Sequence, residues 1–233
     1  MISRPRFISD KSLSKGRREQ MMDARFLRNE MLWGKEGQAR LARAHVILFG
    51  LGGVGSYVAE CLARSGIGEL TLVDGDTVAL SNLNRQLEAL SSTIGLPKAE
   101  AVARRIAEIN PEAVLHPMQA LYNADNRALF FPEGCHYDYI VDAIDLVSCK
   151  LDLAETARRL HIPLIMALGT GNKLDPTAFR IADIGETSVC PLARVVRKEL
   201  RARGILHHRV LWSPEEPKAA LQREAPPPGR RSV

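Results

Sequence analysis

Residues 45–56, HVILFGLGGVGS, give the strongest indication of the fold of this chain. A short apolar run passes there directly into a glycine-rich turn. The next residues, VGSYVAECLARSGIG (54–68), place apolar side chains at helical spacing, and a second apolar run, ELTLVD (69–74), follows. Strand, helix and strand in this order predict a β-α-β unit with parallel strands.

The same alternation continues along the chain. We expect further strands at 112–119, 137–144, 163–169 and 177–184, and further helices at 21–33, 35–44, 98–110, 147–161 and 190–205. Asn110 and Pro111 supply a stop for the helix at 98–110. We therefore predict an α/β fold, a Rossmann-like and mostly parallel sheet with helices on both faces and an N-terminal helical extension.

The composition is that of a soluble globular protein. Of the 233 residues, 45% are hydrophobic and 25% are charged. No stretch approaches the roughly 18 uninterrupted apolar residues that a membrane span needs. Lysine plus arginine is 32 against 27 acidic residues, a formal charge of +5. This mild excess is compatible with a polyanionic partner such as RNA, but many soluble enzymes carry one too.

Cysteine usage and the first residues point to the cytoplasm. Cys61, Cys135, Cys149 and Cys190 are scattered, with no CxxC pair and no Cys/His cluster at zinc-ligand spacing. Free thiols of this kind are typical of a reducing cytosol. The first twenty residues hold six basic side chains and no apolar block of signal-peptide length, so they are not a secretory signal.

We divide the chain into three parts. Residues 1–19 form a basic arm that we expect to be flexible, and residues 20–212 form one nucleotide-binding domain, since single α/β domains often exceed the average domain length. Residues 213–233 carry five prolines and almost no bulky apolar side chains. We expect this tail to be disordered.

The glycine-rich turn predicts a nucleotide site because of its context. Gly50, Gly52 and Gly55 satisfy GxGxxG at a strand-to-helix junction, where glycine permits a tight turn and a close approach of the backbone to phosphate. The following helix offers unpaired N–H groups and the positive end of its dipole to the anion. Asp74 ends the second strand, where a carboxylate can accept two ribose hydroxyls. NAD, FAD and ATP all remain open at this point.

The residues after Asp74 help to choose among these nucleotides. A nicotinamide site usually has apolar residues facing the ring, whereas this stretch offers Asn82, Arg85, Gln86 and Lys98. Arginine binds phosphate oxygens through two parallel hydrogen bonds, and lysine near a helix N-terminus adds a compact charge. Each cation taken singly could be an ordinary surface charge; together they favour a triphosphate.

Two aspartates lie at the end of the strand expected at 137–144: Asp142 within it and Asp145 directly after it. Ligands sit beyond the carboxyl ends of parallel strands, so we expect Asp145 to face the same crevice as the glycine-rich turn. There it is placed to hold Mg²⁺ between phosphates. Asp142 either shares that crevice or only orients the following turn.

Together these residues resemble the ThiF-like superfamily of ATP-dependent adenylating enzymes, which includes the ubiquitin-activating enzymes. GLGGVGS, LTLVDGDTVALSNLNRQ, GLPKAEAVARRIAEINP and VDAID match its motifs in order, and the match covers roughly residues 20–205. The resemblance implies that residues 20–212 are an ATP-binding adenylating domain. It assigns Gly50, Gly52, Gly53 and Gly55 to the nucleotide, Asp74 to the ribose, Asn82, Arg85 and Lys98 to the phosphates, Asp145 to magnesium, and Arg28 to the triphosphate of the partner in a homodimer.

The second half of the chain discriminates within the superfamily. Sulfur-carrier adenylyltransferases have two CxxC pairs for a structural zinc, and this chain has none. GTGNKLDPT (169–177) and TSVCPLARVVRKELR (187–201) instead resemble the tRNA threonylcarbamoyladenosine dehydratase branch. Two departures are Cys190, where the branch has an aspartate, and the end of the chain, where the branch continues into an apolar segment that is missing here.

That branch implies ring closure in the threonylcarbamoyl side chain of a tRNA adenosine, with loss of water, through an acyl-adenylate that releases AMP and pyrophosphate. ATP and Mg²⁺ would be the cofactors, tRNA the substrate, and Arg85, Lys98, Asp145 and Arg28 the catalytic residues. Two alternatives stay open: an adenylyltransferase that activates the C-terminus of a ubiquitin-like sulfur-carrier protein, and a nucleotide-binding scaffold without turnover. A sulfur-transfer or carrier protein could be a partner.

The helix expected at 190–205 is strongly basic. An RNA-facing stripe and a solvated helix face explain this about equally well. Its basic residues are Arg194, Arg197, Lys198, Arg201 and Arg203.

Overall fold

A computed structural model describes residues 15–219, with the side chains of residues 24–219. Within this part of the chain, seven strands form one sheet in the order β3-β2-β1-β4-β5-β7-β6. Neighbouring strands are parallel except at one edge, where β6 pairs antiparallel to β7. The strands are β1 (His45–Phe49), β2 (Glu69–Val73), β3 (Val114–Met118), β4 (Tyr139–Asp142), β5 (Leu164–Ala167), β6 (Arg180–Asp183) and β7 (Arg209–Trp212).

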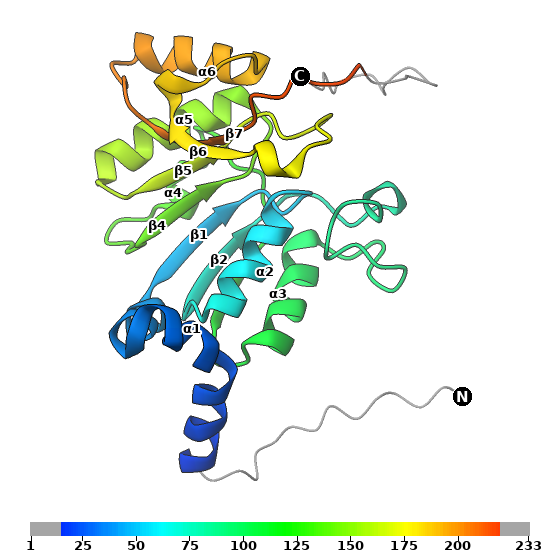
Figure 1. The fold of residues 1–233 in the computed structure, drawn as a ribbon, viewed down its shortest axis with the longest axis vertical. Helices are drawn as coiled ribbons and strands as arrows, with labels where there is room; N and C mark the ends of the chain where they lie inside the picture. The colour runs from blue at the N-terminus through cyan, green and yellow to red at the C-terminus, as the bar shows by residue number, and fades with distance from the viewer. Residues whose placement is uncertain (1–14, 220–233) are drawn as a thin grey trace.

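Helices cover both faces of the sheet, as the sequence predicted (Figure 1). α2 and α3 pack on one face, and α4, α5 and α6 pack on the other. α1 lies beside the end of the sheet where β1 and β2 begin. The helices are α1 (Lys15–Arg43), α2 (Gly55–Ser65), α3 (Lys98–Ile109), α4 (Arg127–Phe130), α5 (Val147–Leu160) and α6 (Pro191–Ala202).

Alternation along the strands builds a hydrophobic core on each face. Successive side chains of a strand point to opposite faces. Val46 and Leu48 of β1 therefore pack with α2 and α3, while Ile47 and Phe49 pack with α5 and α6. All four side chains are buried. Burial on both faces explains why β1 is a continuous apolar run rather than an alternating one.

α1 consists of two helices joined at Gly34. This glycine has φ 73° and ψ 170°, which interrupt the helix, so the two helices expected at 21–33 and 35–44 are confirmed. The helix begins at Lys15, whereas we assigned residues 1–19 to a flexible arm. Residues 15–19 are helical because Lys, Arg and Glu are good helix formers that extend the pattern beginning at residue 21. The rest of the predicted arm, residues 1–14, lies outside the described residues.

The sequence pattern did not predict β7 or α4. Each is a four-residue segment, RVLW and RALF, and neither is part of a longer segment with a recognisable period, as the segments expected at 137–144, 163–169 and 177–184 are. β7 takes its place from pairing with β5 on one side and β6 on the other. Residues 213–219 form no helix or strand, and the remainder of the predicted tail, 220–233, lies outside the described residues. In the part that is described, no helix is both long enough and apolar enough to cross a membrane.

Candidate nucleotide-binding site

The predicted site residues converge where β1, β2 and β4 end. The backbone N–H of Gly50 donates to the carbonyl oxygen of Val73 at 2.8 Å, and the N–H of Ala143 donates to the carbonyl oxygen of Phe49 at 2.8 Å. These two hydrogen bonds join the segments that follow the three strands at one edge of the sheet. This is the edge where ligands bind in open α/β sheets.

Gly50 and Gly55 must be glycine because a side chain at either position would collide with the backbone. Gly50 has φ 85°, and a Cβ atom there would lie 2.7 Å from the carbonyl oxygen of Ala143. A Cβ at Gly55 would lie 1.7 Å from the carbonyl oxygen of Gly50. The turn is therefore folded tightly onto the first turn of α2. Among the described residues no side chain caps α2 at its N-cap residue Val54, although the N–H of Ser56 in the first turn donates to the carbonyl oxygen of Gly52 at 3.0 Å. The start of α2, at the positive end of the helix dipole, suits an anion.

Gly52 and Gly53 are different, because the chain could accommodate a side chain at both. A Cβ at Gly52 would lie 3.5 Å from Nε2 of Gln86, and one at Gly53 would lie 3.5 Å from Cγ of Arg85, both ordinary contact distances. The structure thus brings the glycine-rich turn against the Arg85 segment, as the sequence predicted. The bare backbone at Gly52 and Gly53 suits a close ligand rather than internal packing.

Asp74 holds the glycine-rich turn in place. Its Oδ2 accepts a hydrogen bond from the N–H of Leu51 at 2.7 Å, and its Oδ1 accepts one from the N–H of Asp76 at 2.8 Å. A carboxylate can accept about four hydrogen bonds. The remaining two positions suit a pair of ribose hydroxyls, so a structural role and a ribose-binding role are compatible at Asp74.

The expected phosphate-binding side chains lie around the same turn with local partners. Lys98, the first residue of α3, is only 6% exposed, and its Nζ lies 3.2 Å from Oδ2 of Asp76. Arg85 is exposed and donates from Nη1 to the carbonyl oxygen of Ser81 at 2.9 Å. Asn82 is buried, and its Oδ1 accepts a hydrogen bond from the N–H of Ala79 at 3.0 Å, which closes the turn that precedes Arg85.

The two aspartates at the end of β4 and in the turn after it have different surroundings. Asp142 is fully buried, both of its oxygens lie 3.2 Å from Nζ of Lys150, and Oδ1 accepts the N–H of Ile144 at 3.0 Å. Burial raises the pKa of Asp142, and the Lys150 ammonium opposes that rise. Asp142 therefore orients the turn, the second of the two roles that we considered. Asp145 is exposed in that turn, two residues beyond Ala143, whose carbonyl borders Gly50.

The sequence model of the ThiF family matches residues 26–208. This chain belongs to the ThiF family. A tRNA threonylcarbamoyladenosine dehydratase of Bacillus subtilis (strain 168) is 46% identical over 193 residues, which cover 82% of this chain and 75% of that protein. A protein of the same name from Escherichia coli (strain K12) is 42% identical over 178 residues, which cover 76% of this chain and 66% of that protein.

A solved structure agrees with the family assignment. This ThiF family member matches the crystal structure of E. coli tRNA N6-threonylcarbamoyladenosine dehydratase, TcdA, in complex with ATP, with a TM-score of 0.78 and 39% identity. The match covers 83% of this chain and 82% of that one. The predicted α/β fold and the resemblance to the ThiF-like superfamily are confirmed. E. coli molybdopterin-synthase adenylyltransferase is 33% identical over 160 residues, a weaker similarity.

Two buried polar residues, Gln86 and Glu88, lie beside the predicted site. Within the described part of this ThiF family chain, Oε1 of Gln86 and both carboxyl oxygens of Glu88 have no hydrogen-bond partner. Glu88 is 2% exposed, and burial raises its pKa, while the charge of Lys98 opposes the rise and that of Asp74 adds to it. Glu88 was not predicted from the sequence. Its position two residues after Gln86, in the same segment, was the available signal.

Arg28 does not lie at the site of its own chain. It is exposed on α1, and the adjacent Asn29 donates from Nδ2 to the carbonyl oxygen of Arg64 at 2.8 Å, near the end of α2. The glycine-rich turn lies at the other end of α2, whose 11 residues span about 16 Å. Any contact of Arg28 with a nucleotide in this ThiF family member therefore requires a second chain.

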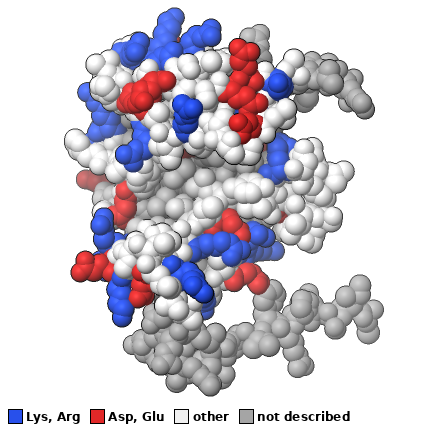
Figure 2. Space-filling view, in the orientation of Figure 1, with Lys and Arg blue, Asp and Glu red and all other residues white. Residues whose placement is uncertain are grey.

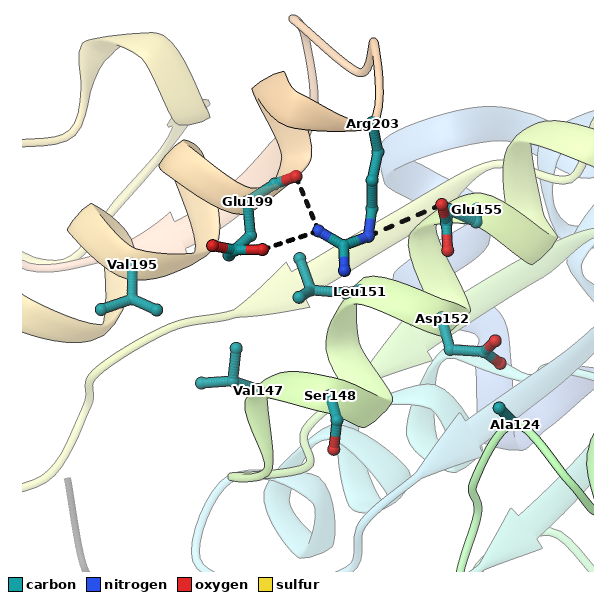
Figure 3. Close-up of a pocket in the computed structure, with 9 residues that line it drawn as sticks. All are labelled: Ala124, Val147, Ser148, Leu151, Asp152, Glu155, Val195, Glu199 and Arg203. Atoms are coloured by element: carbon teal, nitrogen blue, oxygen red, sulfur yellow. Dashed lines mark hydrogen bonds and ion pairs between the residues drawn. The ribbon is translucent and has the colours of Figure 1, made fainter.

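A hollow of about 480 Å³ lies between α5 and α6, and none of the predicted site residues lines it (Figure 3). Its lining includes the carboxylates of Asp152, Glu155 and Glu199. Figure 3 shows Arg203 between two of them: Nη1 donates to Oε2 of Glu199 at 2.8 Å, and Nε lies 3.6 Å from Oε1 of Glu155. An acidic lining repels polyphosphate. These carboxylates make the hollow less suited to a nucleotide than the edge of the sheet at Gly50, where the predicted site residues lie.

Proposed function

We propose that this chain is an ATP-dependent tRNA threonylcarbamoyladenosine dehydratase that acts in the cytoplasm. The observation that carries the proposal is the convergence of Gly50, Asp74, Lys98 and the turn containing Asp145 at one edge of the sheet. This convergence occurs in a chain that is 46% identical to a protein of that name.

The proposed reaction uses ATP to activate a carboxylate, which alone is a poor acylating agent because oxide or hydroxide would have to leave. A carboxylate oxygen of the threonylcarbamoyl group attacks the α-phosphorus of ATP, and pyrophosphate leaves. A nucleophilic atom of the same side chain then attacks the acyl carbon, closes the ring and expels AMP. The net change in the tRNA is the loss of one water. No protein nucleophile is needed, so the protein mainly positions reactants and neutralises charge.

The residues of the site supply these two requirements. The backbone of Gly52 and Gly53 and the uncapped first turn of α2 would receive phosphate, and Asp74 would receive the ribose. Arg85 and Lys98 would neutralise the triphosphate and the leaving pyrophosphate. Lys98 has three N–H donors, so it can keep Asp76 and contact a phosphate oxygen together. Asn82 and Gln86 would complete the polar wall around the phosphates.

Asp145 fits a magnesium ion held jointly with phosphates. Mg²⁺ in nucleotide sites is bound by one or two carboxylates plus phosphate oxygens and waters. Asp145 is an exposed carboxylate in the turn that borders Gly50, whereas Asp142 is committed to Lys150. When bound, the ion would neutralise charge that develops on the phosphates during adenylation.

A homodimer would bring Arg28 to the triphosphate bound by its partner. Within one chain this arginine lies at the opposite end of α2 from the glycine-rich turn. The family resemblance gives it a role in trans, and its exposure on α1 leaves it available. A sulfur-transfer or carrier protein is a further proposed partner, which rests on the resemblance alone.

Fewer basic residues of α6 are available to contact tRNA than the sequence indicated. Figure 2 shows Lys and Arg side chains gathered at the top of the molecule, over α6. Arg197 donates from Nη1 to the carbonyl oxygen and to Oγ1 of Thr187, at 2.7 and 2.6 Å, and Arg203 is engaged by carboxylates. The exposed basic residues left to contact a phosphate backbone are Arg194, Lys198 and Arg201.

One assay separates the proposal from its two alternatives. The protein is incubated with ATP, Mg²⁺ and tRNA bearing threonylcarbamoyladenosine, and both AMP release and the mass of the modified nucleoside are followed. The dehydratase predicts AMP together with the loss of one water from the nucleoside. AMP formed only with a ubiquitin-like carrier protein would favour the adenylyltransferase, and ATP binding without AMP would favour the scaffold.

A further inference from the structure

A second cluster of polar residues lies toward the end of the sheet where β1 and β2 begin, opposite the nucleotide site. His45 and Glu69 are the first residues of β1 and β2 and face each other in the register, while His116 of β3 faces Thr71 of β2. Because side chains two residues apart in a strand share a face, His45, Glu69, Thr71 and His116 project from the same face.

The two imidazoles and the carboxylate meet at one point. Nδ1 of His45 lies 3.5 Å from Oε1 of Glu69, and Nε2 of His116 lies 2.7 Å from the same oxygen. One ligand atom from each residue lies within 4.8 Å of the others. Two ligand atoms on one tetrahedral zinc ion are roughly 3.3 Å apart, given metal–ligand distances of about 2.0–2.1 Å. Small side-chain rotations would therefore bring all three ligand atoms onto one ion.

Thr71 orients the His45 ring for this purpose. Nε2 of His45 lies 2.9 Å from Oγ1 of Thr71, which is 3% exposed and fixed in the core of β2. If Nε2 carries the proton and donates to that hydroxyl, the lone pair of Nδ1 faces Glu69. Histidines that bind metals almost always have their other ring nitrogen held by such a partner. The backbone N–H of His45 is itself held by Oδ2 of Asp138 at 2.8 Å.

The cluster is also accessible. The side chain of His45 is 16% exposed, that of Glu69 is 37% exposed and that of His116 is 46% exposed. An ion could enter from solvent and retain a water as a fourth ligand. Among the residues that the structure describes, this is the one group of three or more His, Cys, Asp or Glu side chains with metal-binding geometry.

We propose that His45, Glu69 and His116 form a binding site for a divalent transition-metal ion of the zinc class. The donor set distinguishes it from the magnesium proposed at Asp145, since imidazole nitrogen suits zinc, nickel and copper, whereas Mg²⁺ takes oxygen ligands. The ligands come from three neighbouring strands, so a bound ion ties β1, β2 and β3 together. Binding to the native state alone stabilises it by mass action.

The test is a zinc titration of the full chain after its metals have been removed with a chelator. Zn²⁺ affinity is measured by competition with a chromogenic chelator, and stoichiometry by native mass spectrometry, with the free thiols blocked beforehand. We expect one zinc per chain. His116→Asn and Glu69→Gln should each weaken binding by at least the roughly tenfold that loss of a ligand's hydrogen-bond partner causes. Both residues are exposed enough for the variants to fold.

His207→Asn is the matched control. His207 also lies near a carboxylate, with Nδ1 3.4 Å from Oδ2 of Asp183, but its side chain is 87% exposed and belongs to no such cluster. Zinc affinity should be unchanged in this variant. Thr71→Val tests the ring orientation, and we expect about 10–100-fold weaker binding. Equal zinc affinity in the wild type and His116→Asn, including the absence of binding in both, would overturn the proposal.

Discussion

The two ends of β1 and β2 differ in how completely the nearby polar groups are hydrogen-bonded. Where β1 and β2 begin, polar groups are paired: His45 with Thr71, His116 with Glu69, and Asn29 with the end of α2. Where β1 and β2 end, the first turn of α2 lacks a side-chain cap, and Gln86 and Glu88 keep unpaired oxygens in buried positions. Most buried polar groups in native proteins are hydrogen-bonded. Unpaired oxygens at Gln86 and Glu88, beside an α2 N-terminus without a side-chain cap, leave this edge of the sheet with hydrogen-bonding capacity that a ligand can use.

Substitution of a glycine in the glycine-rich turn should have the largest effect on stability and on ATP binding. Gly55→Ala places a Cβ at 1.7 Å from the carbonyl oxygen of Gly50, so the turn must open. We expect a loss of about 3 kcal/mol or more in the free energy of unfolding. Chemical denaturation measures this loss, and isothermal titration measures the accompanying loss of ATP binding.

Gly53→Ala is the sharper variant, because its Cβ would lie 3.5 Å from Arg85 and need displace nothing. Its unfolding free energy should stay within about 0.5 kcal/mol of the wild type. If phosphate approaches this backbone, ATP affinity should still fall about tenfold, which corresponds to about 1.4 kcal/mol. Unchanged ATP affinity in a folded Gly53→Ala protein would mean that phosphate does not lie against Gly53.

Asp145→Ala should abolish most turnover and leave the fold intact. Asp145 is exposed, so its removal creates no cavity, while loss of the proposed metal ligand should lower AMP formation by about a hundredfold or more. Glu112→Ala removes an exposed carboxylate just before β3 begins, at the opposite end of the sheet, and serves as the control. Retained activity in Asp145→Ala would remove magnesium from this residue.

The strands and helices could be predicted because hydrophobic period and glycine position are local signals. The placement of the predicted site residues at one edge could be predicted too, since the carboxyl ends of parallel strands lie at the same edge of a sheet. Three features of the structure could not be predicted from the sequence. Glu88 lacks a motif, the Arg197 contact with Thr187 depends on how α6 packs, and the His45 cluster exists only through the register of three strands.

The contact of Arg197 with Thr187 leaves Arg201 as a better candidate for tRNA binding, where we expect a smaller effect. Arg201→Glu should weaken tRNA binding and lower the slope of its salt dependence by about one, as for loss of one phosphate contact. Arg197→Glu should instead act mainly on stability, because Arg197 is already bound to Thr187. Filter binding at several salt concentrations measures the slope. Equal slopes in Arg201→Glu and the wild type would exclude Arg201 from the RNA interface.

The smallest expected effect concerns Glu88. Burial raises its pKa above the ordinary value of 4.5, so the native state binds this proton more tightly than the unfolded state does. The free energy of unfolding should therefore fall as pH rises from about 4.5 through the raised native pKa. Glu88→Gln removes this titration, and its stability should vary less across that window than the stability of the wild type. Urea unfolding at a series of pH values measures both curves, and parallel curves would contradict the assignment.

Hydrogen–deuterium exchange with and without MgATP shows at which end of the sheet the nucleotide binds. The nucleotide is expected at the edge where β1, β2 and β4 end, so MgATP should slow exchange in residues 50–58 and 82–88. Exchange in 45–47 and 114–118, at the other end of the sheet, should not change. Protection confined to 147–155 and 195–203, the hollow between α5 and α6, or no protection at 50–58 would contradict the account.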